Sequence, residues 1–299
     1  MSFQALSQPE SIGRVLDSGF KLFVASLKSV FLLVVVTAII SVIMQYAIFQ
    51  AMVPPQQWPM LEQQQFMTPE NQEYVTPEQQ LYTQEQQLYA QEQMSQHMMA
   101  SLPQVLGITL IMWIVSIILY NAILSRVGDV AAGGDGELYD ALIIGIKKLF
   151  PVFFAAILYS LAVSIGFVLL VIPGLIIMIT LLFFQVLIVV DDEGIIASLK
   201  HSHNLVWGNY WRTTAVILIP VFIVYALIMV VAIAAGFFGA MSEPQMVDDQ
   251  MQMSFGAFDI VMAVVSVLAV PFLDSVFVVH VNDLKLRKSG SDLEQRMSG

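Results

Sequence analysis

The chain of 299 residues contains no cysteine. This absence excludes disulfide scaffolds, thiolate metal sites and cysteine nucleophiles. Charged residues are also scarce, because they make up 12% of the chain, against about 25% in typical globular proteins, while apolar residues make up 58%. Most of this protein must therefore be surrounded by lipid rather than by water.

Six stretches are apolar enough, and at about 20 residues long enough, to cross a bilayer as helices. The sequence therefore predicts an all-α, polytopic membrane protein with six spans in three hairpins. We place the spans near residues 30–52, 105–124, 152–171, 173–190, 215–238 and 258–281.

The third and fourth spans lie within one run, Leu149–Val190, that has no charged side chain. As a single helix this run would be about 63 Å long, twice what a bilayer needs. The dipeptide Pro173-Gly174 lies just past its midpoint, where a tight turn would divide it. We therefore expect a hairpin that turns at Pro173-Gly174.

Lys and Arg are missing from residues 53–104 and 239–257, which separate the first span from the second and the fifth from the sixth. All twelve Lys and Arg lie before the first span, between the second and third, between the fourth and fifth, or after the sixth. Because cytoplasmic loops are enriched in Lys and Arg, this pattern predicts cytoplasmic N- and C-termini and a basic cytoplasmic tail, 282–299. With no cleavable signal expected, the bacterial inner membrane fits best.

Short amphipathic helices are expected before three of the spans. Apolar residues recur at helical spacing from Ile12 to Leu27 and again after Gly194, and Gly136–Phe150 forms a third candidate. Such helices would lie along the cytoplasmic interface. A threefold hairpin repeat explains this pattern, and so does the general enrichment of aromatic and basic residues at membrane interfaces.

Three segments carry a family likeness: Ser11–Phe23, Pro173-Gly174 together with Ile196–Arg212, and Asn282–Glu294, which contains Asp-Leu-Lys-Leu-Arg-Lys. Together they resemble the YciC-type bacterial inner-membrane proteins and the related membrane domain attached to some glycerophosphodiester phosphodiesterases. The resemblance implies a six-helix fold and a role in the cell envelope. It supplies no catalytic residues, and no part of these 299 residues resembles the soluble phosphodiesterase domain.

Asp274 is the strongest single candidate for an intramembrane functional residue, because it lies within the sixth span, about 10 Å from its expected cytoplasmic end. A carboxyl group in lipid is costly unless it is neutral, paired or beside a cavity. The alternative is an Asp hydrogen-bonded to a neighbouring helix close to the interface. Gln185 and Gln45 are candidates for such interhelical hydrogen bonds.

Near the cytoplasmic side, Lys285, Arg287 and Lys288 are candidate contacts for anionic lipid headgroups, although the same charges also fix orientation. His201 and His203 are not expected to share a metal ion, because positions i and i+2 point apart on a helix. We expect Asp191 or Asp192 to cap the following helix. No cofactor, metal or nucleic-acid site is expected.

The outer loop, residues 53–104, is rich in glutamine and contains two successive heptads, Gln80–Gln86 and Gln87–Gln93. Leu81 and Leu88 occupy one heptad position and Tyr82 and Tyr89 the next, which favours a helix extending from the second span and a homo-oligomer contact through these four residues. A glutamine-rich composition is equally typical of a poorly ordered loop.

These observations favour a non-enzymatic inner-membrane protein that acts in envelope or lipid homeostasis through lipid or protein contacts. The rival is a small transporter or channel with a path near Asp274 and Gln185. A membrane-embedded hydrolase is third, because the spans lack convergent catalytic groups.

Overall fold

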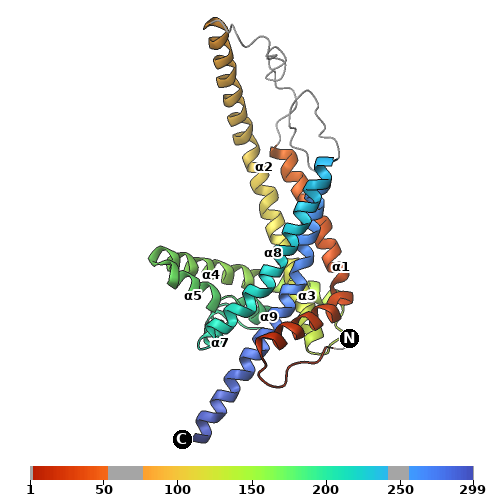
Figure 1. The fold of residues 1–299 in the computed structure, drawn as a ribbon, viewed down its shortest axis with the longest axis vertical. Coiled ribbons are helices and arrows are strands. Elements are labelled where there is room, and N and C mark those ends of the chain that lie inside the picture. The colour runs from red at the N-terminus through yellow and green to blue at the C-terminus, as the bar shows by residue number, and fades with distance from the viewer. Residues whose placement is uncertain (1–2, 53–76, 242–255, 299) are drawn as a thin grey trace.

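A computed structural model describes residues 3–52, 77–241 and 256–298 of the chain, and in these ranges all regular structure is helical. Figure 1 shows the helices, which are α1 Ile12–Met52, α2 Pro77–Ala131, α3 Leu138–Lys147, α4 Leu149–Leu169, α5 Val171–Thr180, α6 Phe184–Val189, α7 Ile195–Val206, α8 Tyr210–Met241 and α9 Ala257–Ser298.

Six helical segments of the described chain are long and apolar enough to cross a membrane, which confirms the predicted number. They are Ile12–Met52, Gln91–Ala131, Leu149–Leu169, Val171–Val189, Tyr210–Ala234 and Phe258–Gly290. The all-helical fold class is therefore confirmed.

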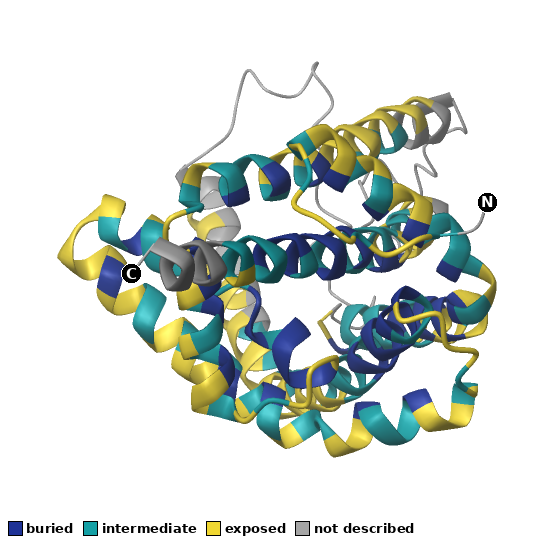
Figure 2. Cartoon of the chain, turned by 90° about the horizontal axis from the view of Figure 1, so that it is seen from below, coloured by how far each residue is buried: buried dark blue, intermediate teal, exposed yellow. Residues whose placement is uncertain are grey.

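The helices α1, α2, α8 and α9 run along the long axis of the molecule (Figure 1). Small residues let them approach closely, as is typical of helices in membranes. At the crossing of α1 and α9, a Cβ atom added to Gly19 would lie 2.8 Å from Val276 Cγ2. Figure 2 shows buried residues on the inward faces and exposed residues on the outer ones.

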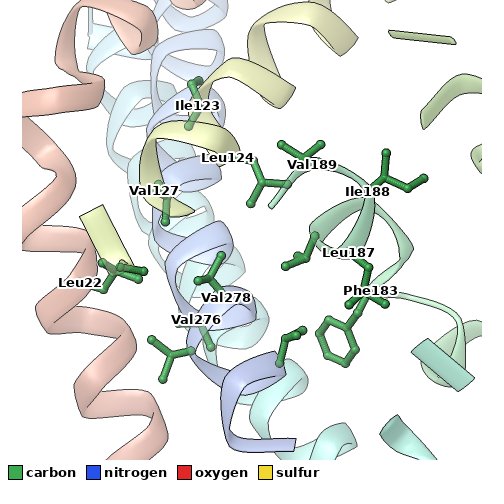
Figure 3. Close-up of a cluster of buried hydrophobic side chains, with 14 of the residues drawn as sticks. Leu22, Ile123, Leu124, Val127, Phe183, Leu187, Ile188, Val189, Val276 and Val278 are labelled. Carbon is green, nitrogen blue, oxygen red and sulfur yellow. The ribbon is translucent and has the colours of Figure 1, made fainter. Parts of the chain in front are cut away.

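A core of buried aliphatic side chains joins these long helices to α6 (Figure 3). Leu22 of α1, Ile123 and Val127 of α2, and Val276 of α9 are all almost fully buried. Phe183, at the start of α6, is completely buried, and its ring stacks edge-on against Phe277 at 5.7 Å. The six-residue α6 is therefore held by packing.

The break between α4 and α5 lies at Leu170, so the expected turn at Pro173-Gly174 was placed three residues too late. Leu170 is extended, with φ −167° and ψ 154°, and α5 begins at Val171. Pro173 is accommodated in the first turn of α5, because N–H groups there have no partner within the helix. Gly174 instead provides close packing, because a Cβ at Gly166 would lie 2.8 Å from Gly174 Cα.

Two of the three expected amphipathic segments form separate helices, α3 and α7. The first, from Ile12 to Leu27, is continuous with the following span in α1, which changes direction along its length (Figure 1). The tail after residue 281 likewise continues α9.

The predicted helical extension of the second span is observed, since α2 begins at Pro77. Its N-terminal half stands apart from the other helices (Figure 1), and Leu81, Leu88 and Tyr89 are exposed. The rest of the predicted outer loop, residues 53–76, lies outside the described residues.

Candidate functional site

A buried cluster of ionic groups joins the two ends of the chain to α8. The carboxylate of Asp283 on α9 accepts hydrogen bonds from Glu10 N at 2.8 Å, from Arg212 Nη2 at 3.0 Å and from Arg287 Nε at 2.9 Å. Both guanidinium groups also donate to the carbonyl oxygen of Glu10. The cluster therefore fixes the N-terminal segment against the first turn of α8 and the C-terminal half of α9.

The charges of this cluster do not balance. Asp283 is fully buried and faces two guanidinium groups, while Glu10 pairs instead with Arg14 at 2.9 Å. A buried carboxylate is tolerated only when its oxygens are fully bonded, and here peptide and guanidinium N–H groups bond both. One positive charge remains, on side chains that are only partly exposed.

His280 lies one turn before Asp283 and is also buried. Its Nε2 is 3.1 Å from Thr213 Oγ1 on α8, and its ring stacks against Phe183 at 5.6 Å. Its Nδ1 has no hydrogen-bond partner among the described residues. His280 therefore continues the polar contact between α8 and α9 by one further helical turn.

Three successive acidic residues between α6 and α7 each pair with a different basic side chain. Asp191 accepts from Lys285 of α9 at 2.6 Å, Asp192 from Lys148, and Glu193 lies beside His201. The hydrogen bond from Lys148 holds the pKa of the exposed Asp192 carboxyl below its usual range. Gly194 precedes α7 without a side-chain cap, so the expected capping by Asp191 or Asp192 was wrong.

The predicted intramembrane residues Asp274 and Gln185 lie near the same helix, α2. Gln185 Nε2 donates to Asn121 Oδ1 at 3.1 Å, so Gln185 forms an interhelical hydrogen bond with Asn121 rather than with Asp274. Asp274 interacts electrostatically with Tyr120, the residue before Asn121. The Oδ2 atom of Asp274 is buried without a hydrogen-bond partner in the described structure.

Two of the predicted headgroup contacts have acidic partners within the protein. Lys285 pairs with Asp191 and Arg287 with Asp283, and Lys288 is half-buried at the same end of α9. Lys285 and Arg287 therefore connect α9 to the loop after α6 and to the buried ionic cluster.

The described residues contain no group of three His, Asp or Glu side chains that could hold a metal ion. His203 stacks against Trp207 at 5.1 Å, while His201 pairs with Glu193. An open depression is lined by Lys148, Pro151 and residues 192–197. Neither Asp274 nor Gln185 lines it.

Sequence reasoning missed Asp283, His280 and Arg212 as members of a site. The spacing of Asp283 and Arg287, four residues apart, indicates an ion pair along a helix. Arg212 and Glu10 reach the same carboxylate only through the tertiary fold, since they lie 71 and 273 residues away.

The uncharacterised protein family UPF0259 matches residues 15–243 of the chain. The chain belongs to this family. The matched region includes Gln185, Asn121 and Arg212, whereas Asp274 and Asp283 lie beyond it.

Curated UPF0259 relatives are described as membrane proteins. One from Pectobacterium carotovorum is 27% identical over 117 residues, which cover 39% of this chain and 47% of the relative. Another, from Photorhabdus laumondii, is 28% identical over 94 residues, 31% of this chain and 37% of the relative. This chain spans less than half the length of either relative. No solved structure matches it.

Proposed function

We propose that this UPF0259 protein acts in the bacterial inner membrane, in envelope or lipid homeostasis, through contacts with lipids and proteins and without catalytic turnover. It has both termini in the cytoplasm and its short helices α3 and α7 at the cytoplasmic interface. It is of the YciC type, related to the membrane domain attached to some glycerophosphodiester phosphodiesterases.

The observation that carries this proposal is the separation of polar and apolar groups. Asp283, Arg212 and Arg287 bond to one another across helices, as do Gln185 and Asn121. The outer faces of α4 and α8 carry many exposed large apolar side chains. Such faces suit acyl chains, and the cations at the end of α9 suit anionic headgroups.

Native mass spectrometry of the protein, extracted gently from its own membrane, tests the lipid contact. We expect anionic lipids to remain bound, and fewer of them in a variant with Lys285→Gln and Lys288→Gln. Lys21→Gln removes one charge from α1 and is the control, since it should leave lipid retention unchanged. Equal lipid retention in all three proteins would contradict a headgroup site at the end of α9.

The same spectra give the number of subunits. We propose a homo-oligomer in which the outer part of α2 contacts a second copy through exposed Leu81, Leu88 and Tyr89. A monomer in every detergent that preserves the fold would remove this contact.

A transporter or channel is the second candidate, because the buried Oδ2 of Asp274 has no hydrogen-bond partner in the described chain. Such a carboxyl group inside a membrane protein is typical of ion and proton paths. Proteoliposomes holding a pH-sensitive dye test this: a proton flux above that of empty liposomes, lost in Asp274→Asn, would support it. Equal flux in the wild type and the variant would exclude this path.

A further inference from the structure

The hairpin formed by α4 and α5 points away from the other long helices. Figure 1 shows α1, α2, α8 and α9 along the long axis, whereas α4 and α5 lie side by side across it. The tip of the hairpin also lies at the outer margin of the molecule when seen from below (Figure 2). If the four long helices cross the bilayer, this hairpin lies along it.

The segments that lead into and out of this hairpin lie close together. Lys148, which precedes α4, pairs with Asp192 in the loop after α6. Near this base, Trp113 of α2 stacks edge-on against Phe153 at 5.2 Å. A hairpin that crosses the bilayer twice and one that enters and returns would both satisfy the distribution of basic residues, so charge alone does not separate them.

The tip has the composition of a segment buried in hydrocarbon. Residues 168–172 are Val-Leu-Leu-Val-Ile, and each of these side chains is 63–86% exposed on the protein. Loops that reach water usually carry Gly, Asn, Asp or Ser. Trp and Tyr, which mark the membrane interface, are absent between Tyr159 and Trp207. Five exposed apolar side chains are unsuited to an aqueous turn.

The backbone of the tip is also arranged to limit unpaired polar groups. Leu170 N donates to Gly166 O at 3.0 Å, and Leu170 O accepts from Gly174 N at 3.2 Å. Pro173 has no N–H group to leave unpaired. Because an unpaired backbone group in hydrocarbon costs several kcal/mol, a connection of one extended residue followed by proline suits burial in lipid.

We propose that the α4–α5 hairpin enters the cytoplasmic leaflet and returns to the cytoplasm without crossing the bilayer, with the acyl chains of that leaflet around its tip. Four helices then cross the membrane, and both termini stay on the same side. The inference rests on the proposed orientation, which the control variants below test separately.

Because the natural chain has no cysteine, single-cysteine variants report topology without background. Leu170→Cys marks the tip, Ser95→Cys the outer part of α2, and Ser289→Cys the cytoplasmic end of α9. Each is treated with a membrane-impermeant maleimide in right-side-out and inside-out vesicles, and again after denaturation in SDS. Val168→Cys repeats the test at the most exposed position of the tip.

We expect the tip cysteine to react about tenfold less than either control from both sides, and fully in SDS, because the reactive thiolate is suppressed in apolar surroundings. Ser95→Cys should react only from outside and Ser289→Cys only from the cytoplasmic side. If these controls are reversed, the orientation fails. If they hold and the tip reacts from either side, the hairpin proposal alone fails.

A second measurement identifies the leaflet. A fluorophore on the tip cysteine is quenched by nitroxide-labelled lipids in inside-out vesicles, and external ascorbate then destroys the nitroxides of the cytoplasmic leaflet. Recovery of fluorescence after ascorbate supports the proposal. Persistent quenching would place the tip in the outer leaflet and overturn it.

Discussion

At the scale of single residues, Asp283 connects parts of the chain that are far apart in sequence. Its carboxylate is the acceptor shared by Arg212, Arg287 and the peptide N–H of Glu10. Removing one member of a buried ionic group leaves its partners desolvated and uncompensated, which costs more than an exposed pair contributes. The contact between the chain ends and α8 therefore depends on one carboxyl group.

We expect Asp283→Asn to lower the free energy of unfolding by about 3 kcal/mol, because two guanidinium groups would face each other without a counter-charge. Thermal unfolding in a fixed detergent measures this. Asp17→Asn removes an exposed carboxylate that pairs with Lys21 along α1 and should cost about 0.5 kcal/mol or less. Equal effects of the two substitutions would contradict the role given to the cluster.

Substitution of Asp274 should raise the free energy of unfolding instead of lowering it. Its buried Oδ2 has no hydrogen-bond partner among the described residues, so Asp274→Leu should raise the free energy of unfolding by about 1–3 kcal/mol. Asp274→Asn keeps a polar group at this position, so it should raise the free energy of unfolding less than Asp274→Leu does. Thermal unfolding of both variants in the same detergent checks the order, and a loss of stability in both would show that the carboxyl group is paired.

At the scale of helices, close contacts between glycines decide how α4 and α5 meet. A Cβ atom at Gly166 would lie 2.8 Å from Gly174 Cα, and one at Gly174 would lie 2.6 Å from the ring of Phe167. The atom nearest to the added Cβ of Gly166 belongs to the backbone of α5, which cannot move aside as the end of a flexible side chain could. These glycines therefore set the separation of the two helices.

Gly166→Ala should destabilise the protein by about 1–3 kcal/mol, because the added methyl group forces α4 and α5 apart. Gly107→Ala on α2 is the matched control, since nothing lies within 4 Å of its Cβ position. That substitution should be neutral or stabilise by up to about 1 kcal/mol through helix propensity. Thermal unfolding compares the two, and similar melting temperatures would argue against a tight hairpin.

At the scale of the whole molecule, the outer part of α2 combines apolar and acidic groups. Leu81 and Leu88 are exposed, Glu85 and Glu92 lie on the same helix, and residues 53–104 contain no Lys or Arg. Two copies that meet there would be attracted by apolar contact and repelled by charge. At 0.1 M salt, the repulsion between exposed charges more than about 10 Å apart is largely screened.

The proposed homo-oligomer should therefore strengthen with salt. We expect the dimer fraction in detergent to rise when salt increases, and to fall in a variant with Leu81→Ala and Leu88→Ala at any salt. Light scattering coupled to size exclusion measures both. A dimer that dissociates as salt rises would mean that ionic pairs hold it, which would contradict an acidic apolar contact.

Much of the fold followed from patterns along the chain. Six apolar stretches predicted six helical segments, because a bilayer sets the length that each must have. The repeated heptads favoured an extension of the second span, and α2 begins at Pro77. The turn between the third and fourth spans was misplaced, because proline is tolerated in the first turn of a helix as well as in the break before it.

The sequence by itself determined the helical class, the number of apolar segments and the distribution of positive charge, since these depend on composition and local spacing. Tertiary structure alone brought Glu10, Arg212 and Asp283 together, gave Gln185 its partner Asn121, and turned α4 and α5 across the long axis. Such contacts join residues far apart in the chain. The helical period of a segment shows which of its faces is apolar, but it does not determine which helix packs against that face.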